Sequence, residues 1–134
     1  MISTILALQR ATHVTLGQLA RDLADLALTP AELNVLANLA DGADRTVTSL
    51  GQAVGSRPTT LTGVLDRLER RTLITRGAHP GDRRAVLISL TPAGQETAAR
   101  VRATVDEIER RALAGLPPES VTAALAVLSA LADE

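Results

Sequence analysis

The chain has 134 residues, of which 46% are hydrophobic and 22% are charged, and its formal net charge is −1. These values are typical of one folded domain with a core of its own, and they exclude a disordered chain. Cysteine and aromatic residues are absent. The sequence therefore excludes disulfides, thiolate metal sites and an aromatic platform on which single-stranded nucleic acid could stack its bases.

Charge is distributed unevenly along the chain. All 14 basic residues are arginines, and residues 45–84 hold eight of them against three carboxylates, a net charge of +5, whereas the remainder carries −6. A basic middle between acidic ends is typical of a chain that binds a polyanion through its middle. The longest uncharged run near the C-terminus, residues 120–132, is shorter than the about 20 residues that cross a bilayer. Since residues 1–8 also do not resemble a secretory signal, we expect a cytoplasmic location.

Hydrophobic periodicity predicts two helices before residue 45. The first extends over residues 2–28, where four leucines recur on one helical face: Leu16, Leu19, Leu23 and Leu26. The second begins at Pro30, because Thr29 can cap it and Glu32 can complete a capping box, and it ends within residues 41–44.

A pair of shorter helices follows. Thr48 is expected to cap a helix over residues 49–54, and Gly55 breaks the chain. Ser56-Arg57-Pro58 then opens a helix that runs to about Arg71. Its inner face is predicted to consist of Leu61, Val64 or Leu65, and Leu68. Two helices joined by a short turn that contains glycine indicate a helix-turn-helix.

The hydrophobic period then changes from 3.6 residues to 2. Residues 73–76 and 85–90 predict two strands, and residues 79–84 predict a turn-rich loop with two adjacent arginines between them. A hairpin placed directly after a helix-turn-helix is the wing of a winged-helix domain.

Two further helices are predicted after the hairpin. Thr91-Pro92 begins one that runs to about Ala114, and Pro117-Pro118 begins the last. The apolar helices at the two chain ends have little core of their own to cover, so we expect them to pack on each other across a two-fold axis. Their polar faces are acidic or mixed, which argues against contact with an anionic membrane.

Linked motifs in the middle of the chain resemble a known family. Asp82-Arg83-Arg84, followed after five residues by Leu90-Thr91-Pro92-Ala93-Gly94, resembles the wing signature of the MarR-type transcriptional regulators. Residues 58–62 and 64–69 resemble that family's recognition helix, and residues 28–33 with Val35-Leu36 resemble its second helix. The resemblance extends over the whole chain in element order and is closest over about residues 28–95.

The resemblance implies a mainly α fold with a small β-hairpin wing, a winged helix-turn-helix with terminal dimerisation helices. Residues 1–134 would form one domain, with residues 29–91 as the DNA-binding part and residues 1–28 and 92–134 as the helical dimerisation part. It also implies a homodimer that binds an inverted-repeat operator in double-stranded DNA and can be released by a small-molecule effector. The resemblance admits a repressor or an activator, of which a repressor is the expected one.

Three features depart from the family's pattern. Thr72 stands where glycine is usual, and a left-handed backbone there would cost on the order of 1 kcal/mol. Gly63 stands where an arginine is common, which removes one contact to a base or phosphate. The first helix is also short for the family, which predicts a smaller dimer interface.

The helix over residues 57–71 would lie in the major groove, with side chains near its N-terminus at the base edges. Arg57 and Arg67 are candidates for guanine, and Arg70 and Arg71 for the DNA backbone. A solvated, charged helix surface is the alternative for this face. The candidate DNA-binding residues, the wing included, are Arg57, Thr59, Thr60, Thr62, Gly63, Arg67, Arg70, Arg76, Arg83 and Arg84.

The wing, residues 79–84, would reach the minor groove with Arg83 or Arg84. Asp82 cannot favour DNA, so we expect it to orient an arginine, Arg84, through paired hydrogen bonds. A surface turn with an ordinary ion pair is the alternative for this segment.

Other classes of function remain as alternatives at this point. A winged helix that binds an acidic protein would carry the same basic face, and salt-dependent duplex binding separates the two. The sequence holds no nucleophile with a base, no phosphate-binding glycine loop and no metal-ligand cluster, so we expect neither an enzyme nor a cofactor. His13, Leu16 and Leu36 are candidates to line an aliphatic effector pocket, although His13 also suits an exposed surface.

Overall fold

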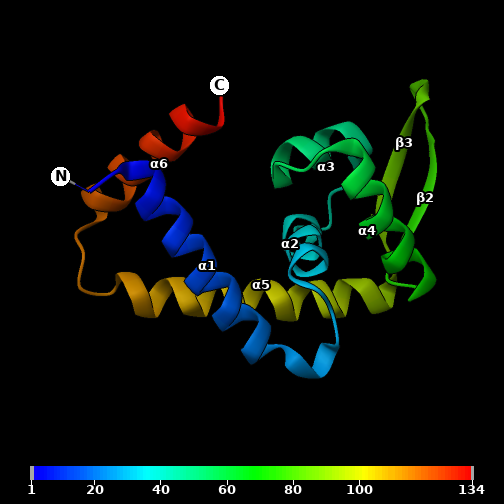
Figure 1. The fold of residues 1–134 in the computed structure, drawn as a ribbon. Coiled ribbons are helices and arrows are strands. Elements are labelled where there is room, and N and C mark those ends of the chain that lie inside the picture. Colours follow the sequence, from blue (N-terminus) through cyan, green and yellow to red (C-terminus); the bar gives the residue numbers. More distant parts are fainter. Residues whose placement is uncertain (1, 134) are drawn as a thin grey trace.

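The computed structural model describes residues 2–133. Along the chain the elements are α1 (Thr4–Asp22), the short 3₁₀ helix η1 (Ala24–Leu26), α2 (Pro30–Leu39), β1 (Arg45–Thr46), α3 (Val47–Val54), α4 (Pro58–Arg70), β2 (Ile74–His79), β3 (Asp82–Leu90), α5 (Pro92–Leu113) and α6 (Pro118–Ala132). Figure 1 shows α5 along the base of the molecule, with α1 crossing it and α6 beyond its far end. Helices α2 to α4 and the hairpin lie over the first half of α5.

The helix-turn-helix and the hairpin share one hydrophobic core. The strand order is β1-β3-β2, with both pairs antiparallel. Helix α4 buries its whole inner face, because Val64 and Leu65 both lie in the core together with Leu61 and Leu68. The prediction of a mainly α fold with a hairpin wing is confirmed, with β1 as a third, very short strand that the sequence pattern did not indicate.

A second core joins α1, α2 and α5. It consists of Leu19, Leu23, Leu33, Val101 and Ile108. Helix α5 belongs to both cores, since its Ala98 lies in the first cluster and its Val101, one turn later, in the second. The position of α1 relative to α3, α4 and the hairpin therefore depends on α5.

Side-chain caps begin most of the helices. The predicted capping box at α2 is present, with Glu32 N–H donating to Thr29 Oγ1 (3.2 Å) and Thr29 N–H donating to Glu32 Oε1 (3.0 Å). The prediction for α3 was wrong by two residues, because Thr46 Oγ1, and not that of Thr48, accepts the N–H of Ser49. Helix α3 therefore begins at Val47.

The first helix is shorter than the leucine pattern predicts. It ends at Asp22, and the chain continues as η1 up to Ala27, whose φ of 53° lies in the left-handed region. The leucine stripe continues through this turn because Leu23 is buried and Leu26 is partly buried against the second core. An apolar pattern alone therefore did not locate the break.

The predicted loop over residues 79–84 is wrong, because only Pro80 and Gly81 lie between the strands. His79 pairs with Asp82 across the hairpin. The N–H of Gly81 donates to His79 Nδ1, and the N–H of Arg84 donates to Asp82 Oδ1, both at 2.9 Å. These side-chain acceptors satisfy the backbone beside a tight turn, so both strands extend to the tip.

The link between the hairpin and α5 explains the motif that ends at Gly94. Thr72 has a φ of 60°, the left-handed backbone considered above, and its carbonyl accepts a hydrogen bond from the hydroxyl of Thr91 (2.6 Å). Thr91 Oγ1 in turn accepts the N–H of Gly94 (2.9 Å). A Cβ atom at Gly94 would overlap the carbonyl oxygen of Leu73. The start of α5 can thus approach the chain after α4 only where residue 94 has no side chain.

We predict that Gly94→Ala lowers the free energy of unfolding by about 2–3 kcal/mol, because the backbone of Leu73 must move to admit the methyl group. Urea denaturation measures this change. Gly115→Ala is the matched control, since a Cβ atom there has no heavy atom within 4 Å. Equal midpoints for the two variants would contradict the argument from close approach.

Candidate nucleic-acid interface

One face of the molecule combines the outer side of α4 with the hairpin. Arg57 is the N-cap of α4 and makes no side-chain hydrogen bond to the helix, so the first N–H groups of α4 are free for another partner. Of the predicted residues on this helix, only Gly63 is half-buried, and the exposed ones are Arg57, Thr59, Thr60, Thr62, Arg67 and Arg70. A helix N-terminus with exposed hydroxyl and guanidinium groups provides the donors that bind phosphates and base edges.

Four arginines on this face have no ion pair with any carboxylate in residues 2–133: Arg57, Arg70, Arg83 and Arg84. Arg57 is at the start of α4, and Arg83 and Arg84 are at the hairpin tip. The expected side-chain pair between Asp82 and Arg84 is not formed, because Asp82 accepts the backbone N–H of Arg84 instead. Asp82 therefore shapes the turn and leaves both wing guanidinium groups available.

Arg76 lies among the predicted DNA-binding residues but is engaged within the protein. Its guanidinium contacts Asp66 (2.7 Å) and Glu69 (2.9 Å), both on α4. These hydrogen bonds lower the pKa of Glu69 and raise the pKa of Arg76. This contact joins β2 to α4, and the single positive charge of Arg76 offsets part of the negative charge of the two α4 carboxylates, which would otherwise repel a polyanion more strongly.

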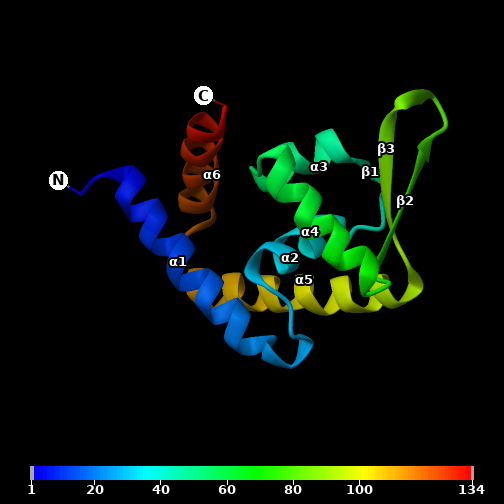
Figure 2. The same ribbon diagram turned by 45° about the vertical axis from the view of Figure 1, so that its right-hand side comes forward.

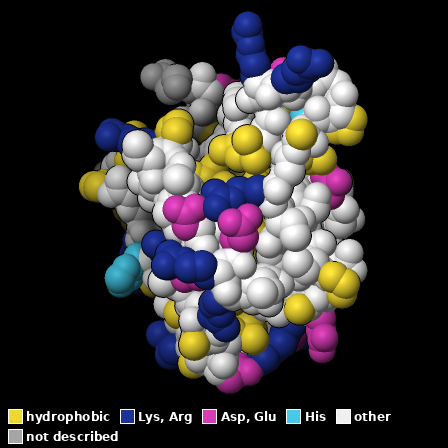
Figure 3. Space-filling view, turned by 90° about the vertical axis from the view of Figure 1, so that its right-hand side faces the viewer, with side chains coloured by type: hydrophobic (Ala, Val, Ile, Leu, Met, Phe, Trp, Pro, Cys, Tyr) yellow, Lys and Arg dark blue, Asp and Glu magenta, His cyan; other side chains and the backbone are white. Residues whose placement is uncertain are grey.

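Three more arginines of the basic segment contact other parts of the chain. Arg45 donates to the carbonyl of Asn38 (3.0 Å). Arg67 Nε lies 3.8 Å from Glu32 Oε1 on α2, while about half of its side chain stays exposed. Arg71 donates to two carbonyls of the connection between α1 and α2. Figure 3 shows the result on this face, with acidic and basic side chains side by side in the middle and basic ones at the top.

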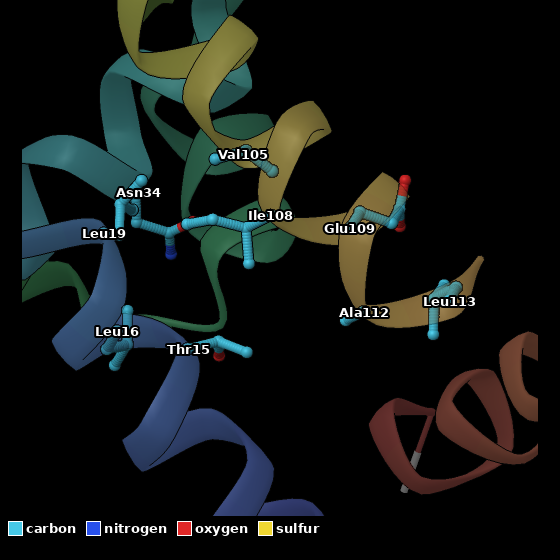
Figure 4. Close-up of a pocket in the computed structure, with 9 residues that line it drawn as sticks. All are labelled: Thr15, Leu16, Leu19, Asn34, Val105, Ile108, Glu109, Ala112 and Leu113. Carbon is cyan, nitrogen blue, oxygen red and sulfur yellow. The ribbon is translucent and has the colours of Figure 1, made fainter. Parts of the chain in front are cut away.

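A separate cavity of about 370 Å³ lies between α1, α2 and α5 (Figure 4). Its polar groups are Thr15, Asn34 and Glu109, and the carboxylate of Glu109 points away from Thr15 and from the α1 side of the cavity (Figure 4). The remaining lining side chains are aliphatic: Leu16, Leu19, Val105, Ile108, Ala112 and Leu113. The cavity therefore suits a small, largely apolar molecule.

The structure brings together two of the three residues that the sequence grouped as an effector pocket. Leu16 lines the cavity, and it also lines a second hollow together with the exposed His13, Arg21 and Pro30. Leu36 lines neither of these two spaces, because α2 buries it in the first core, under α3 and α4. The role of His13 and Leu16 in binding an effector stays a prediction.

No group of three His, Asp or Glu side chains in residues 2–133 is placed to hold a metal ion. No single helix in that part of the chain is long and apolar enough to cross a membrane.

We predict that Arg76→Gln raises the pKa of Glu69 towards its ordinary value, which a carboxyl NMR titration measures. The folded protein lowers this pKa, so the ion pair stabilises the fold at neutral pH and is lost as pH falls through the lowered pKa. In the variant, the part of the pH dependence of stability that comes from this ion pair should disappear. Arg102→Gln is the control, because Arg102 pairs with Asp106 on α5. A Glu69 pKa that is unchanged in Arg76→Gln would show that the contact is absent in solution.

Comparisons with known proteins agree with this geometry. The model of the MarR family matches residues 28–86. MdtR of Bacillus subtilis, an HTH-type transcriptional repressor, is 33% identical over 106 residues, which are 79% of this chain and 68% of that protein. BpsR of Bordetella bronchiseptica, whose DNA binding is regulated by 6-hydroxynicotinic acid, is 27% identical, with a TM-score of 0.79 over 98% of this chain and 94% of that one.

A second solved structure has the same fold. MepR of S. aureus, solved in its DNA-binding conformation, has a TM-score of 0.87 over 97% of this chain and 96% of that one, at 21% identity. At that identity the likeness concerns the fold alone. Together with the family match and the 33% identity to MdtR, the exposed α4 face and the arginine-tipped hairpin lead to one conclusion: the chain belongs to the MarR family of winged-helix, DNA-binding transcriptional regulators.

Proposed function

We propose that this protein acts as a homodimeric repressor that reads an inverted repeat in double-stranded DNA. Helix α4 of each subunit would enter the major groove, and each hairpin would reach the adjacent minor groove. The observation that carries the proposal is the set of arginines on this face that have no carboxylate partner in residues 2–133. These are Arg57 at the start of α4, Arg70 at its end, and Arg83 and Arg84 at the hairpin tip. We further propose a cytoplasmic location and no enzymatic activity.

The start of α4 supplies the groups for sequence reading. Thr62 donates its hydroxyl proton to the carbonyl of Pro58 (2.8 Å), so its oxygen can only accept a further hydrogen bond, and its exposed side chain also carries a methyl group. A methyl group of this kind suits the methyl of thymine. Thr59 and Thr60 keep free hydroxyls near the helix N-terminus, where a phosphate is favoured.

Dimer formation would cover an apolar surface at one end of the molecule. Helix α6 has no buried residue, and its Leu125 and Leu128 are 58% and 39% exposed. At the beginning of α1, Ile5 and Leu6 are 52% and 64% exposed. The start of α1 and helix α6 lie at the same end of the molecule (Figures 1 and 2). A second copy would bury both groups about a two-fold axis and place two α4 helices on one side of the duplex.

Selection from a random pool of duplex DNA at near-physiological salt tests the proposal. We expect an inverted repeat with half-sites about one helical turn apart. Leu125→Glu should prevent dimer formation and recover single half-sites, whereas Gln95→Glu, on an exposed position at the start of α5, should behave as the wild type. Retention without an enriched sequence would favour the protein-binding alternative.

The double variant Arg83→Ala with Arg84→Ala tests the wing. We expect lower affinity and a less steep dependence of log K on log salt concentration. The slope should decrease by up to the contribution of two phosphate contacts per subunit, because each free guanidinium that binds a phosphate releases counterions from the DNA. Titrations at several salt concentrations measure the slope. Arg102→Ala is the control, since this arginine lies on α5 with a carboxylate partner. An unchanged slope in the wing variant would exclude the hairpin as a DNA contact.

We also propose that the cavity between α1 and α5 receives an effector that releases the DNA. In BpsR the regulator is a carboxylic acid, 6-hydroxynicotinic acid. The cavity here has no arginine or histidine in its lining, so a carboxylate would be left without a cation. The aliphatic wall instead favours neutral molecules.

A matched pair of probes checks this preference. We expect 6-hydroxynicotinamide to raise the melting temperature more than 6-hydroxynicotinic acid does. Val105→Phe should remove the difference by filling the cavity. Tighter binding of the acid would contradict the preference for neutral molecules.

A further inference from the structure

We propose that Arg71 is a positioning residue for DNA recognition: it ties the end of α4 to the turn between α1 and α2, and so sets the spacing at which a dimer reads its two half-sites. The inference rests on the proposed function, because spacing has meaning only for a dimer on an inverted repeat. It assigns Arg71 a role inside the protein in place of the phosphate contact that its sequence position predicts.

The geometry of Arg71 is specific. Its Nη1 donates to the carbonyl of Ala27 (2.8 Å) and its Nη2 to the carbonyl of Leu26 (2.9 Å). One planar guanidinium therefore holds two consecutive backbone carbonyls with charge-assisted hydrogen bonds. Those carbonyls lie 44 and 45 residues earlier in the chain, at the end of η1 where no further helical N–H is available to them.

The turn to which Arg71 donates these hydrogen bonds is also restrained by other contacts. Asp25, in the same turn, pairs with Arg100 of α5 through both of its carboxylate oxygens, one of them at 2.8 Å. Leu23 packs in the second core, and Ala27 adopts its left-handed backbone immediately before α2. A turn restrained by α5 from one side and by α4 from the other transmits a movement of either element to the other.

The turn also follows directly after α1, which carries both the cavity and the proposed dimer surface. Leu16 and Leu19 line the cavity, and α1 ends at Asp22, one residue before the turn region. A ligand or a partner that moves α1 therefore moves the carbonyls to which Arg71 is bound. Arg67, one turn earlier on α4, faces the same side but reaches only Glu32 at 3.8 Å. Arg71 is thus the direct bond between α4 and the α1 side of the molecule.

Arg70 provides a matched comparison. It neighbours Arg71 and is exposed, but its Nε donates to the carbonyl of Asp66 within α4 (3.3 Å) and it makes no hydrogen bond to the turn. If both arginines served only as phosphate contacts, their removal would have the same effect. If Arg71 positions α4, the two variants differ in kind.

The experiment measures affinity for a series of operators whose half-site spacing varies in steps of one base pair. For Arg71→Gln we expect about tenfold weaker binding at the best spacing, little change at the others, and an unchanged salt slope. Arg70→Gln should weaken all spacings equally and reduce the salt slope by about one phosphate's worth per subunit. Arg71→Lys replaces the planar guanidinium by a single ammonium group, so its affinity at the best spacing should lie between those of Arg71→Gln and the wild type.

A second measurement needs no DNA. Hydrogen exchange of the free protein should accelerate in Arg71→Gln at two separate places, residues 24–28 and the last turn of α4, and at neither in Arg70→Gln. Equal spacing profiles for Arg71→Gln and the wild type, or a reduced salt slope in Arg71→Gln, would overturn the inference. Were the wild type to bind no operator, the proposed function would fail, and exchange unchanged at residues 24–28 would then overturn the positioning role separately.

Discussion

Helix α5 is the constraint on which the arrangement of the molecule depends, because it belongs to both hydrophobic cores. Its start is held against the chain after α4 at Gly94, where a side chain would overlap the backbone of Leu73. Ala98 then packs under the helix-turn-helix and Val101 under α1 and α2. Because both cores share one helix, α1 forms a single packed body with α3, α4 and the hairpin. A displacement on one side therefore changes the packing on the other.

The arginines divide into two groups with different physical roles. Four of the eight in the basic segment are held by partners within the chain, and Arg76 and Arg71 are the clearest cases, with three and two hydrogen bonds. The others are without carboxylate partners in the described chain, and three of these flank the surface at the start of α4 and the hairpin tip. Net charge along the sequence therefore overstates the number of cations that face a polyanion, although it locates the right surface.

Local signals in the sequence gave reliable helix starts where a side chain caps its own helix. The capping box at Thr29 and Glu32 is present, because both partners lie within three residues. The predicted helix boundaries were wrong where two residues could cap the same helix, or where the backbone left the helical conformation within an unbroken apolar pattern. Thr46 and Thr48 are both able to cap α3, and the leucine stripe continues past the break at Asp22. The hairpin turn was predicted too long, since His79 and Asp82 bind backbone groups and let the strands extend to Pro80.

The sequence by itself determined the order of the elements, the family and the basic face, because periodicity, caps and the motif from Asp82 to Gly94 act over a few residues. The tertiary structure alone decided which arginines are free, which residues share a cavity and what holds α4 in place. Those outcomes depend on groups far apart in the chain, such as Arg71 and the carbonyl of Ala27, or Asp25 and Arg100. No local pattern records such pairs, since they form only when α5 brings the two halves of the chain together.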